Sequence, residues 1–88
     1  MALRVELLPT ALDELRSLPK KIQGQIWKKI NSLELNALPS GSKILNSQLG
    51  YRSLRSGDYR ILYKFDDKKK LVTISNIGDR KEVYRLIE

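Results

Sequence analysis

The first residues of the chain show two hydrophobic periods in succession. From Leu3 to Leu8 apolar and polar residues alternate, which predicts a strand that is buried on one face. Pro9 ends this alternation, and from Ala11 to Leu18 the apolar residues return every three or four positions, which predicts a short helix with one apolar stripe. Thr10 stands just before that stripe, so we expect its side-chain oxygen to cap the first helical turn.

A second and stronger helical pattern follows between Pro19 and Leu35. Its apolar stripe consists of Ile22, Ile26, Ile30 and Leu33. Pro19 suits the start of this helix, and we expect the helix to end near Leu35. Lys21 and Lys28 project from the opposite side and give the helix a basic outer face. Such a face is equally expected from simple solvation and from contact with nucleic acid.

The second half of the chain is rich in strand-forming residues. Residues 36–42 contain proline, glycine and small polar residues and are predicted to form a loop, and residues 43–49 are expected to be extended but irregular. Three strands are then predicted, separated by turns at 56–58 and 66–70: Tyr51–Arg55, Tyr59–Phe65 and Leu71–Ile77.

The predicted order of elements is therefore β-α-α-β-β-β, followed by a short C-terminal helix or tail. Strands joined by short links pair as an antiparallel meander, so we expect a small antiparallel sheet with both helices packed on one face, an α+β fold. A chain of 88 residues supports one modest core. We therefore expect residues 1–88 to form a single domain.

Alternation along the strand at 59–65 separates an apolar face from a more basic one. Arg60 and Lys64 fall on the less apolar face. We expect Arg52 to emerge from the preceding strand and Arg80 from the loop after the last strand, so that several guanidinium groups converge on one surface. The alternative is that these cations are scattered and pair with aspartates of the neighbouring turns.

Composition excludes several chemistries and favours a polyanionic partner. The chain has no cysteine and no histidine, so it holds no disulfide, thiol nucleophile or catalytic histidine. Its 17 lysines and arginines exceed its 10 acidic residues, which gives a formal charge of +7 and a field that attracts RNA, DNA or an acidic protein. Apolar runs are far shorter than the ~20 residues that span a bilayer. The N-terminus lacks the features of a signal peptide, so we expect a cytoplasmic protein.

Several segments together resemble the RelE/ParE superfamily of bacterial and archaeal toxins. The motif GDYRILY at Gly57–Tyr63 carries the resemblance first, and the other matching segments are ALDELRSLP at Ala11–Pro19, the YRSLR segment at Tyr51–Arg55 and IGDRKEVYR at Ile77–Arg85. The resemblance implies a small sheet with two N-terminal helices. It also implies a toxin of a toxin-antitoxin system, whose partner is an acidic, RelB-like antitoxin in a heteromeric complex.

Within the superfamily the RelE-like branch cuts mRNA in the ribosomal decoding site, whereas the ParE-like branch poisons DNA gyrase. The functional set of the RelE-like branch maps by motif onto Arg60, Arg80 and Tyr84, which the resemblance implies are catalytic. Arg52 and Arg55 stand where that branch has lysines, which leaves the general base open. The resemblance and the charge pattern also assign RNA-binding roles, to Arg52, Arg55, Lys64, Lys81, Lys21 and Lys28.

The expected reaction is attack by the 2′-hydroxyl of RNA on the adjacent phosphate, without a metal or other cofactor. Arginine supplies charge and bidentate contacts to phosphate, but its pKa above about 12 makes it a poor base. Tyrosine, with a pKa near ~10 in water, serves as a base only where neighbouring cations favour its phenolate. The ribosome and its mRNA are therefore the expected partners. A gyrase inhibitor and a basic binding module without catalysis remain the alternatives.

Overall fold

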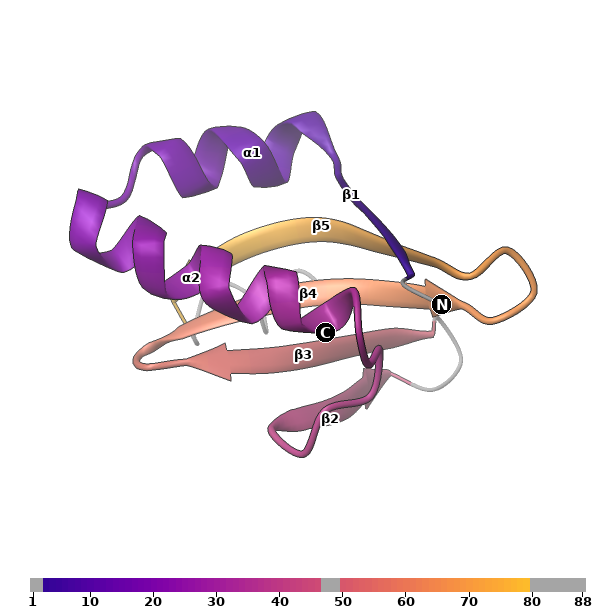
Figure 1. Ribbon diagram of the computed structural model, residues 1–88. Coiled ribbons are helices and arrows are strands. Elements are labelled where there is room, and N and C mark those ends of the chain that lie inside the picture. The colour runs from indigo at the N-terminus through magenta and orange to yellow at the C-terminus, as the bar shows by residue number, and fades with distance from the viewer. Residues whose placement is uncertain (1–2, 47–49, 80–88) are drawn as a thin grey trace.

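The computed structural model describes residues 3–46 and 50–79, and over these the chain forms five strands and two helices (Figure 1). In chain order they are β1 (Arg4–Leu7), α1 (Pro9–Arg16), α2 (Lys20–Leu33), β2 (Ser42–Asn46), β3 (Tyr51–Ser56), β4 (Tyr59–Asp66) and β5 (Leu71–Asp79). Each helix and strand predicted within the described residues is present. The predicted C-terminal helix or tail lies outside the described residues.

A proline stands at the start of each helix, and neither helix has a capping hydroxyl: Pro9 is the first residue of α1, and Pro19 directly precedes α2. Pro9 is the first residue of α1 and Leu8 is its N-cap, with no side-chain hydrogen bond, so the predicted Thr10 cap is wrong. Proline has no amide hydrogen to leave unpaired and its fixed φ already fits the first turn, which explains the earlier start. Pro19 is the N-cap of α2, and this helix ends at Leu33, two residues before the predicted Leu35.

The sheet has the strand order β1-β5-β4-β3-β2. From β2 to β5 neighbouring strands are antiparallel, which confirms the predicted meander. β1 differs, because it pairs in parallel with β5, with Arg4 opposite Leu71 and Leu7 opposite Ile74. The sheet is therefore mixed rather than wholly antiparallel. The stretch expected to be irregular contains β2, a regular edge strand except for one register shift between Ile44 and Asn46.

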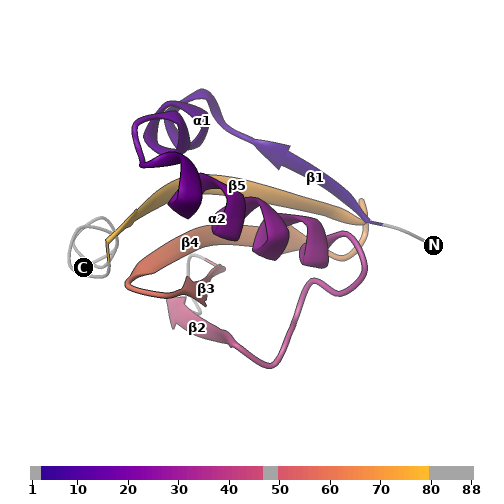
Figure 2. The ribbon, with the colours of Figure 1, turned by 60° about the vertical axis from the view of Figure 1, so that its left-hand side comes forward.

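One face of the sheet carries both helices, and the core lies between them and the strands (Figure 2). Ile26, Ile30 and Leu33 of α2 are buried together with β4 and β5 residues, among them Ile61 and Val72. The Tyr63 hydroxyl donates a 2.8 Å hydrogen bond to the Ala37 carbonyl oxygen, which ties the loop after α2 to the centre of the sheet.

A two-residue turn at Gly57 and Asp58 connects β3 to β4. Gly57 has φ of 59°, a conformation that favours glycine, and Asp58 has a negative φ, which is the pattern of a type II′ hairpin turn. Ser56 pairs with Tyr59 across this turn. The turn therefore fixes the register of the whole hairpin, and with it the face on which each side chain lies.

Candidate nucleic-acid interface

The hairpin register defines the open face, by which we mean the face of the sheet opposite α1 and α2. Residues directly opposite each other on neighbouring strands point to the same side of a sheet. The pairs on the helix side are recognised by their packing in the core, as for Leu54 and Ile61. The alternate pairs therefore lie on the open face: Tyr51 with Lys64, Ser53 with Leu62, and Arg55 with Arg60.

Arg55 and Arg60 are directly opposite each other on the open face. Arg60 is only 5% exposed, whereas Arg55 is exposed and its Nε donates a 2.9 Å hydrogen bond to the Gly57 carbonyl oxygen. Two like charges in direct cross-strand positions destabilise a sheet. Arginine side chains bind phosphate through charge-assisted hydrogen bonds, so two arginines in this arrangement suit a phosphate group.

Burial on the open face exceeds what the alternation predicted. The less apolar side of β4 was expected to be wet, yet Leu62 and Ser53 are fully buried and Arg60 nearly so. The Ser53 hydroxyl oxygen is also buried and has no hydrogen-bond partner among the described residues. The centre of this face is therefore covered, and the exposed cations lie at its two ends, Arg55 at one and Lys64 at the other.

Arg52 does not join this site, which corrects the predicted convergence. It is opposite Tyr63, on the helix side of the sheet, and its Nη2 donates a 3.0 Å hydrogen bond to the Ser42 hydroxyl oxygen. Its Nε is buried and has no partner within the described part of the chain. The register across the turn explains the difference: it places Arg55 opposite Arg60, and Arg52, three residues from Arg55, therefore faces the other side of the sheet.

Lys64 and Tyr51 form the other end of the open face. The Lys64 ammonium lies 4.4 Å from the centre of the Tyr51 ring, a cation–π contact across β3 and β4. Lys64 was predicted to share a face with Arg60, and the register confirms it. Tyr51 was not singled out, although its place directly opposite Lys64 follows once the two-residue turn is recognised.

Lys21 and Lys28 are exposed on α2, which covers the other face of the sheet. The structure therefore does not bring them together with Arg55, Arg60 and Lys64. Their assignment as RNA contacts stays a prediction, and such a contact would form a second basic surface.

Arg80, Lys81 and Tyr84 lie outside the described residues. The strand that leads to them ends beside Arg60, because Gly78 is opposite Arg60 and Asp79 is opposite Tyr59. Glu14 of α1 holds this end of β5: its Oε1 accepts hydrogen bonds from the Ile77 amide at 3.1 Å and from Asn76 Nδ2 at 3.2 Å. The last described residues of the chain are thus fixed next to the Arg55–Arg60 pair.

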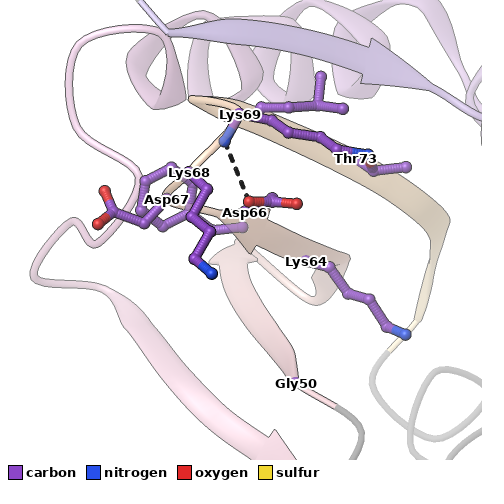
Figure 3. A pocket seen from close by; sticks show the side chains of 9 residues that line it. Gly50, Lys64, Asp66, Asp67, Lys68, Lys69 and Thr73 are labelled. Carbon is purple, nitrogen blue, oxygen red and sulfur yellow. Dashed lines mark hydrogen bonds between the residues drawn. The ribbon is translucent and has the colours of Figure 1, made fainter.

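A cavity of about 700 Å³ opens at the β4–β5 turn, at the Lys64 end of the open face (Figure 3). Its lining includes Lys64, Lys68 and Lys69, together with Asp66 and Asp67. The sequence pattern predicts only a turn at 66–70, and Lys68 and Lys69 of that turn were not among the predicted site residues. The run of three lysines, Lys68 to Lys70, was the available signal.

The described residues contain no cluster of three or more acidic, histidine or cysteine side chains able to hold a metal ion. Neither helix in the described part of the chain is long and apolar enough to cross a membrane.

Comparison with known proteins places this arrangement in a family. Residues 5–84 match the family described as "ParE toxin of type II toxin-antitoxin system, parDE". Toxin RelG of Mycobacterium tuberculosis is 30% identical over 86 residues, which cover 97% of this chain and 99% of that protein. Toxin RelE of the same organism is 34% identical over 83 residues, which cover 93% of this chain and 86% of that protein.

A solved structure agrees with these sequence matches. The crystal structure of the toxin-antitoxin complex RelBE2 from Mycobacterium tuberculosis contains a chain that superimposes with a TM-score of 0.80 at 30% identity, covering 91% of this chain and 93% of that one. The fold, the match over nearly the whole chain and the RelE-type relatives agree, and the chain belongs to the RelE/ParE family of toxins of type II toxin-antitoxin systems.

Proposed function

We propose that this toxin is a ribosome-dependent endoribonuclease that cleaves mRNA in the decoding site and so stops translation. The observation that carries the proposal is the Arg55–Arg60 pair, two arginines directly opposite each other on neighbouring strands at one end of the open face. Two relatives of at least 30% identity, named toxin RelG and toxin RelE, support the RelE-like branch over the gyrase-directed one.

In the proposed reaction the 2′-hydroxyl oxygen of one nucleotide attacks the adjacent phosphorus and the bond to the 5′-oxygen of the next nucleotide breaks. A proton leaves the 2′-hydroxyl and another reaches the departing oxygen, so the products are a 2′,3′-cyclic phosphate and a free 5′-hydroxyl. Arg60 and Arg80 stabilise the negative charge of the pentavalent phosphorus. Tyr84 transfers a proton. The reaction uses no metal ion.

A site without histidine depends strongly on how its substrate is held. Orientation of reacting groups can supply ~7 kcal/mol or more of a barrier. The ribosome would provide that orientation by holding the message in one conformation, which is why we propose cleavage of translated mRNA in the cytoplasm rather than of free RNA.

We also propose that a RelB-like antitoxin with an acidic segment holds the toxin inactive in a heteromeric complex. The similar solved structure is that of a toxin-antitoxin complex, and the +7 charge favours an acidic partner. Co-expression with the neighbouring antitoxin gene should yield a co-purifying complex and restore growth. Recovery of the toxin alone, together with an absence of any growth defect when it is expressed alone, would contradict this.

The decisive experiment maps breaks in a translated message. Expression of the toxin should produce breaks that primer extension detects, and blocking translation initiation on that message should abolish them. Arg60→Ala should reduce cleavage on purified ribosomes by about 100-fold or more, as for the loss of one preorganised stabilising group. Lys29→Ala, which removes an exposed charge from α2, is the matched control and should leave cleavage unchanged.

Tyr84 is tested by removing only its hydroxyl. Tyr84→Phe should lower single-turnover cleavage while thermal stability and ribosome binding stay the same, because the ring is retained. Full cleavage by this variant would remove Tyr84 from the catalytic set.

The second candidate function is inhibition of DNA gyrase, and the description of the matching family as ParE toxin favours it. In that case purified protein should inhibit gyrase supercoiling and leave ribosome-bound mRNA intact. The endoribonuclease proposal expects the reverse.

A further inference from the structure

The cavity at the β4–β5 turn is the second strongly charged site of the molecule, and we call it the lysine cavity after Lys64, Lys68 and Lys69. It has a volume of about 700 Å³, and Gly50, Leu71 and Thr73 complete much of its wall. Figure 3 shows the residues that line it, with Lys64, Lys68 and Lys69 labelled. It lies at the opposite end of β4 from Arg60 and is therefore distinct from the proposed cleavage site.

The two aspartates of the cavity are already engaged. Asp66 Oδ1 accepts a 3.1 Å hydrogen bond from the Lys69 amide, drawn dashed in Figure 3. Asp67 Oδ1 lies 2.8 Å from Nζ of Lys70, which is not part of the lining. Within residues 3–46 and 50–79 the ammonium groups of Lys64, Lys68 and Lys69 form no ion pair with a carboxylate. The three ammonium groups outnumber the Asp66 carboxylate, which is hydrogen-bonded only to a neutral amide, so the cavity keeps a net positive charge for an anion from outside.

The geometry favours single-stranded RNA as the source of that anion. Lys64 lies over the Tyr51 ring, and sites for single strands combine cations that follow the backbone with aromatic rings on which bases stack. Lys64 also shares the open face with Arg60, four residues away along β4, which is roughly 13 Å at about 3.3 Å per residue. The two sites are therefore close enough for one strand of RNA to reach both, with the fully buried Leu62 between them.

We propose that the lysine cavity binds backbone phosphates of the message, at nucleotides beyond the scissile one. This inference rests on the proposed function for the identity of the RNA, and it adds a site that contributes affinity and position without touching the reacting atoms. An acidic protein segment is the competing ligand, and ribosomal RNA is the competing source of phosphate.

The test measures binding by the full chain of a 12-nucleotide single-stranded RNA that carries 2′-O-methyl groups and so cannot be cleaved. Fluorescence anisotropy over a range of salt concentrations gives both affinity and salt dependence. Each phosphate neutralised on a single strand contributes about 0.7 to the slope of log affinity against log salt. The triple variant Lys64→Gln, Lys68→Gln, Lys69→Gln should therefore lower the slope by about 2 and weaken binding by about 10-fold or more.

Two control variants distinguish the loss of this site from a general loss of positive charge and from misfolding. A matched triple of exposed residues in α1 and α2, Arg16→Gln, Lys20→Gln and Lys29→Gln, removes the same charge from the helix side and should change the slope by less than half as much. Replacement of the three cavity lysines by arginine keeps the charge and should keep the binding. Equal slopes for the glutamine triple and its matched control would overturn the proposal.

Two further binding measurements distinguish message RNA from the competing ligands. Loss of affinity for vacant ribosomes with unchanged affinity for the oligonucleotide would assign the cavity to ribosomal RNA and overturn the proposal. Loss of binding to a polyglutamate peptide alone would assign it to an acidic protein segment, with the same consequence. A separate outcome would contradict the proposed function and leave the cavity proposal standing: wild-type toxin leaves translated mRNA intact, while the cavity variant still loses affinity for the oligonucleotide.

Discussion

Replacing Glu14 with alanine should loosen the end of β5 that lies beside Arg60. β1 pairs with the edge of β5 only as far as Ile74, and beyond that residue the Glu14 side chain accepts hydrogen bonds from β5. Its Oε1 accepts from the Ile77 amide at 3.1 Å and from Asn76 Nδ2 at 3.2 Å. Glu14→Ala leaves both donors without their acceptor.

The magnitude follows from these two bonds. A hydrogen bond to a charged group contributes about 1.5–3 kcal/mol, and because the site is partly exposed, water replaces some of the lost contact, which leaves about 1–2 kcal/mol of lost stability. For a domain of this size that corresponds to a fall in Tm of about 4–16 °C. Glu14→Gln retains an oxygen at the same position, so it should cost less than half as much.

Urea unfolding followed by circular dichroism measures the free energies, and hydrogen exchange locates the effect. The Ile77 amide should exchange faster in Glu14→Ala, while the Ile61 amide in the centre of the sheet changes only as far as global stability does. Asp13→Ala is the control, since Asp13 is exposed on the same helix and its side chain makes no hydrogen bond among the described residues. The reasoning is refuted if Glu14→Ala and Asp13→Ala are equally stable within about 0.5 kcal/mol.

Three further outcomes follow from particular contacts. Tyr63→Phe removes the donor to the buried Ala37 carbonyl and should cost about 1–2 kcal/mol in urea unfolding, whereas an unchanged midpoint would show that this bond contributes nothing. Arg55→Gln removes one of the two opposed positive charges and the hydrogen bond to the Gly57 carbonyl, and it should lower RNA cleavage by about 10-fold or more; unchanged cleavage on ribosomes would remove Arg55 from the site. Gly57→Ala should destabilise the hairpin by about 1–2 kcal/mol, because φ of 59° is strained for any side chain, and a neutral result would show that the turn relaxes.

The elements with local signals were predictable from the sequence, and those that depend on distant pairing were not. α2 follows from Ile22, Ile26, Ile30 and Leu33, whose spacing alone specifies a helix buried on one side. No sequence pattern indicates the parallel pairing of β1 with β5, because alternation shows that a segment is a strand but not which strand it pairs with. β2 was expected to be irregular since a short edge strand with one exposed isoleucine, Ile44, has little pattern.

The site was predicted only in part, because the sequence did not determine the register across the turn between β3 and β4. Arg60 and Lys64 are on one strand, so their shared face follows from simple alternation. The face on which Arg52 lies depends on the register between β3 and β4. The predicted three-residue turn at 56–58 did not determine this register. The observed two-residue turn does determine it. The burial of Arg60 at 5% exposure also carries no sequence signal, since an arginine is exposed in most proteins.

The pairing of β1 with β5 has a consequence for the order of events during synthesis. Arg4 pairs with Leu71 and Leu7 pairs with Ile74, so the first strand made needs the last described strand as its partner. At ~5–20 residues per second the ribosome takes about 3–13 s to reach β5 after β1, and throughout that time β1 has no strand beside it. The sheet therefore closes only after Ile74 has been made. Until then the backbone groups of β1 that pair with β5 have no strand beside them, so the sheet is one of the last parts of residues 3–79 to be completed.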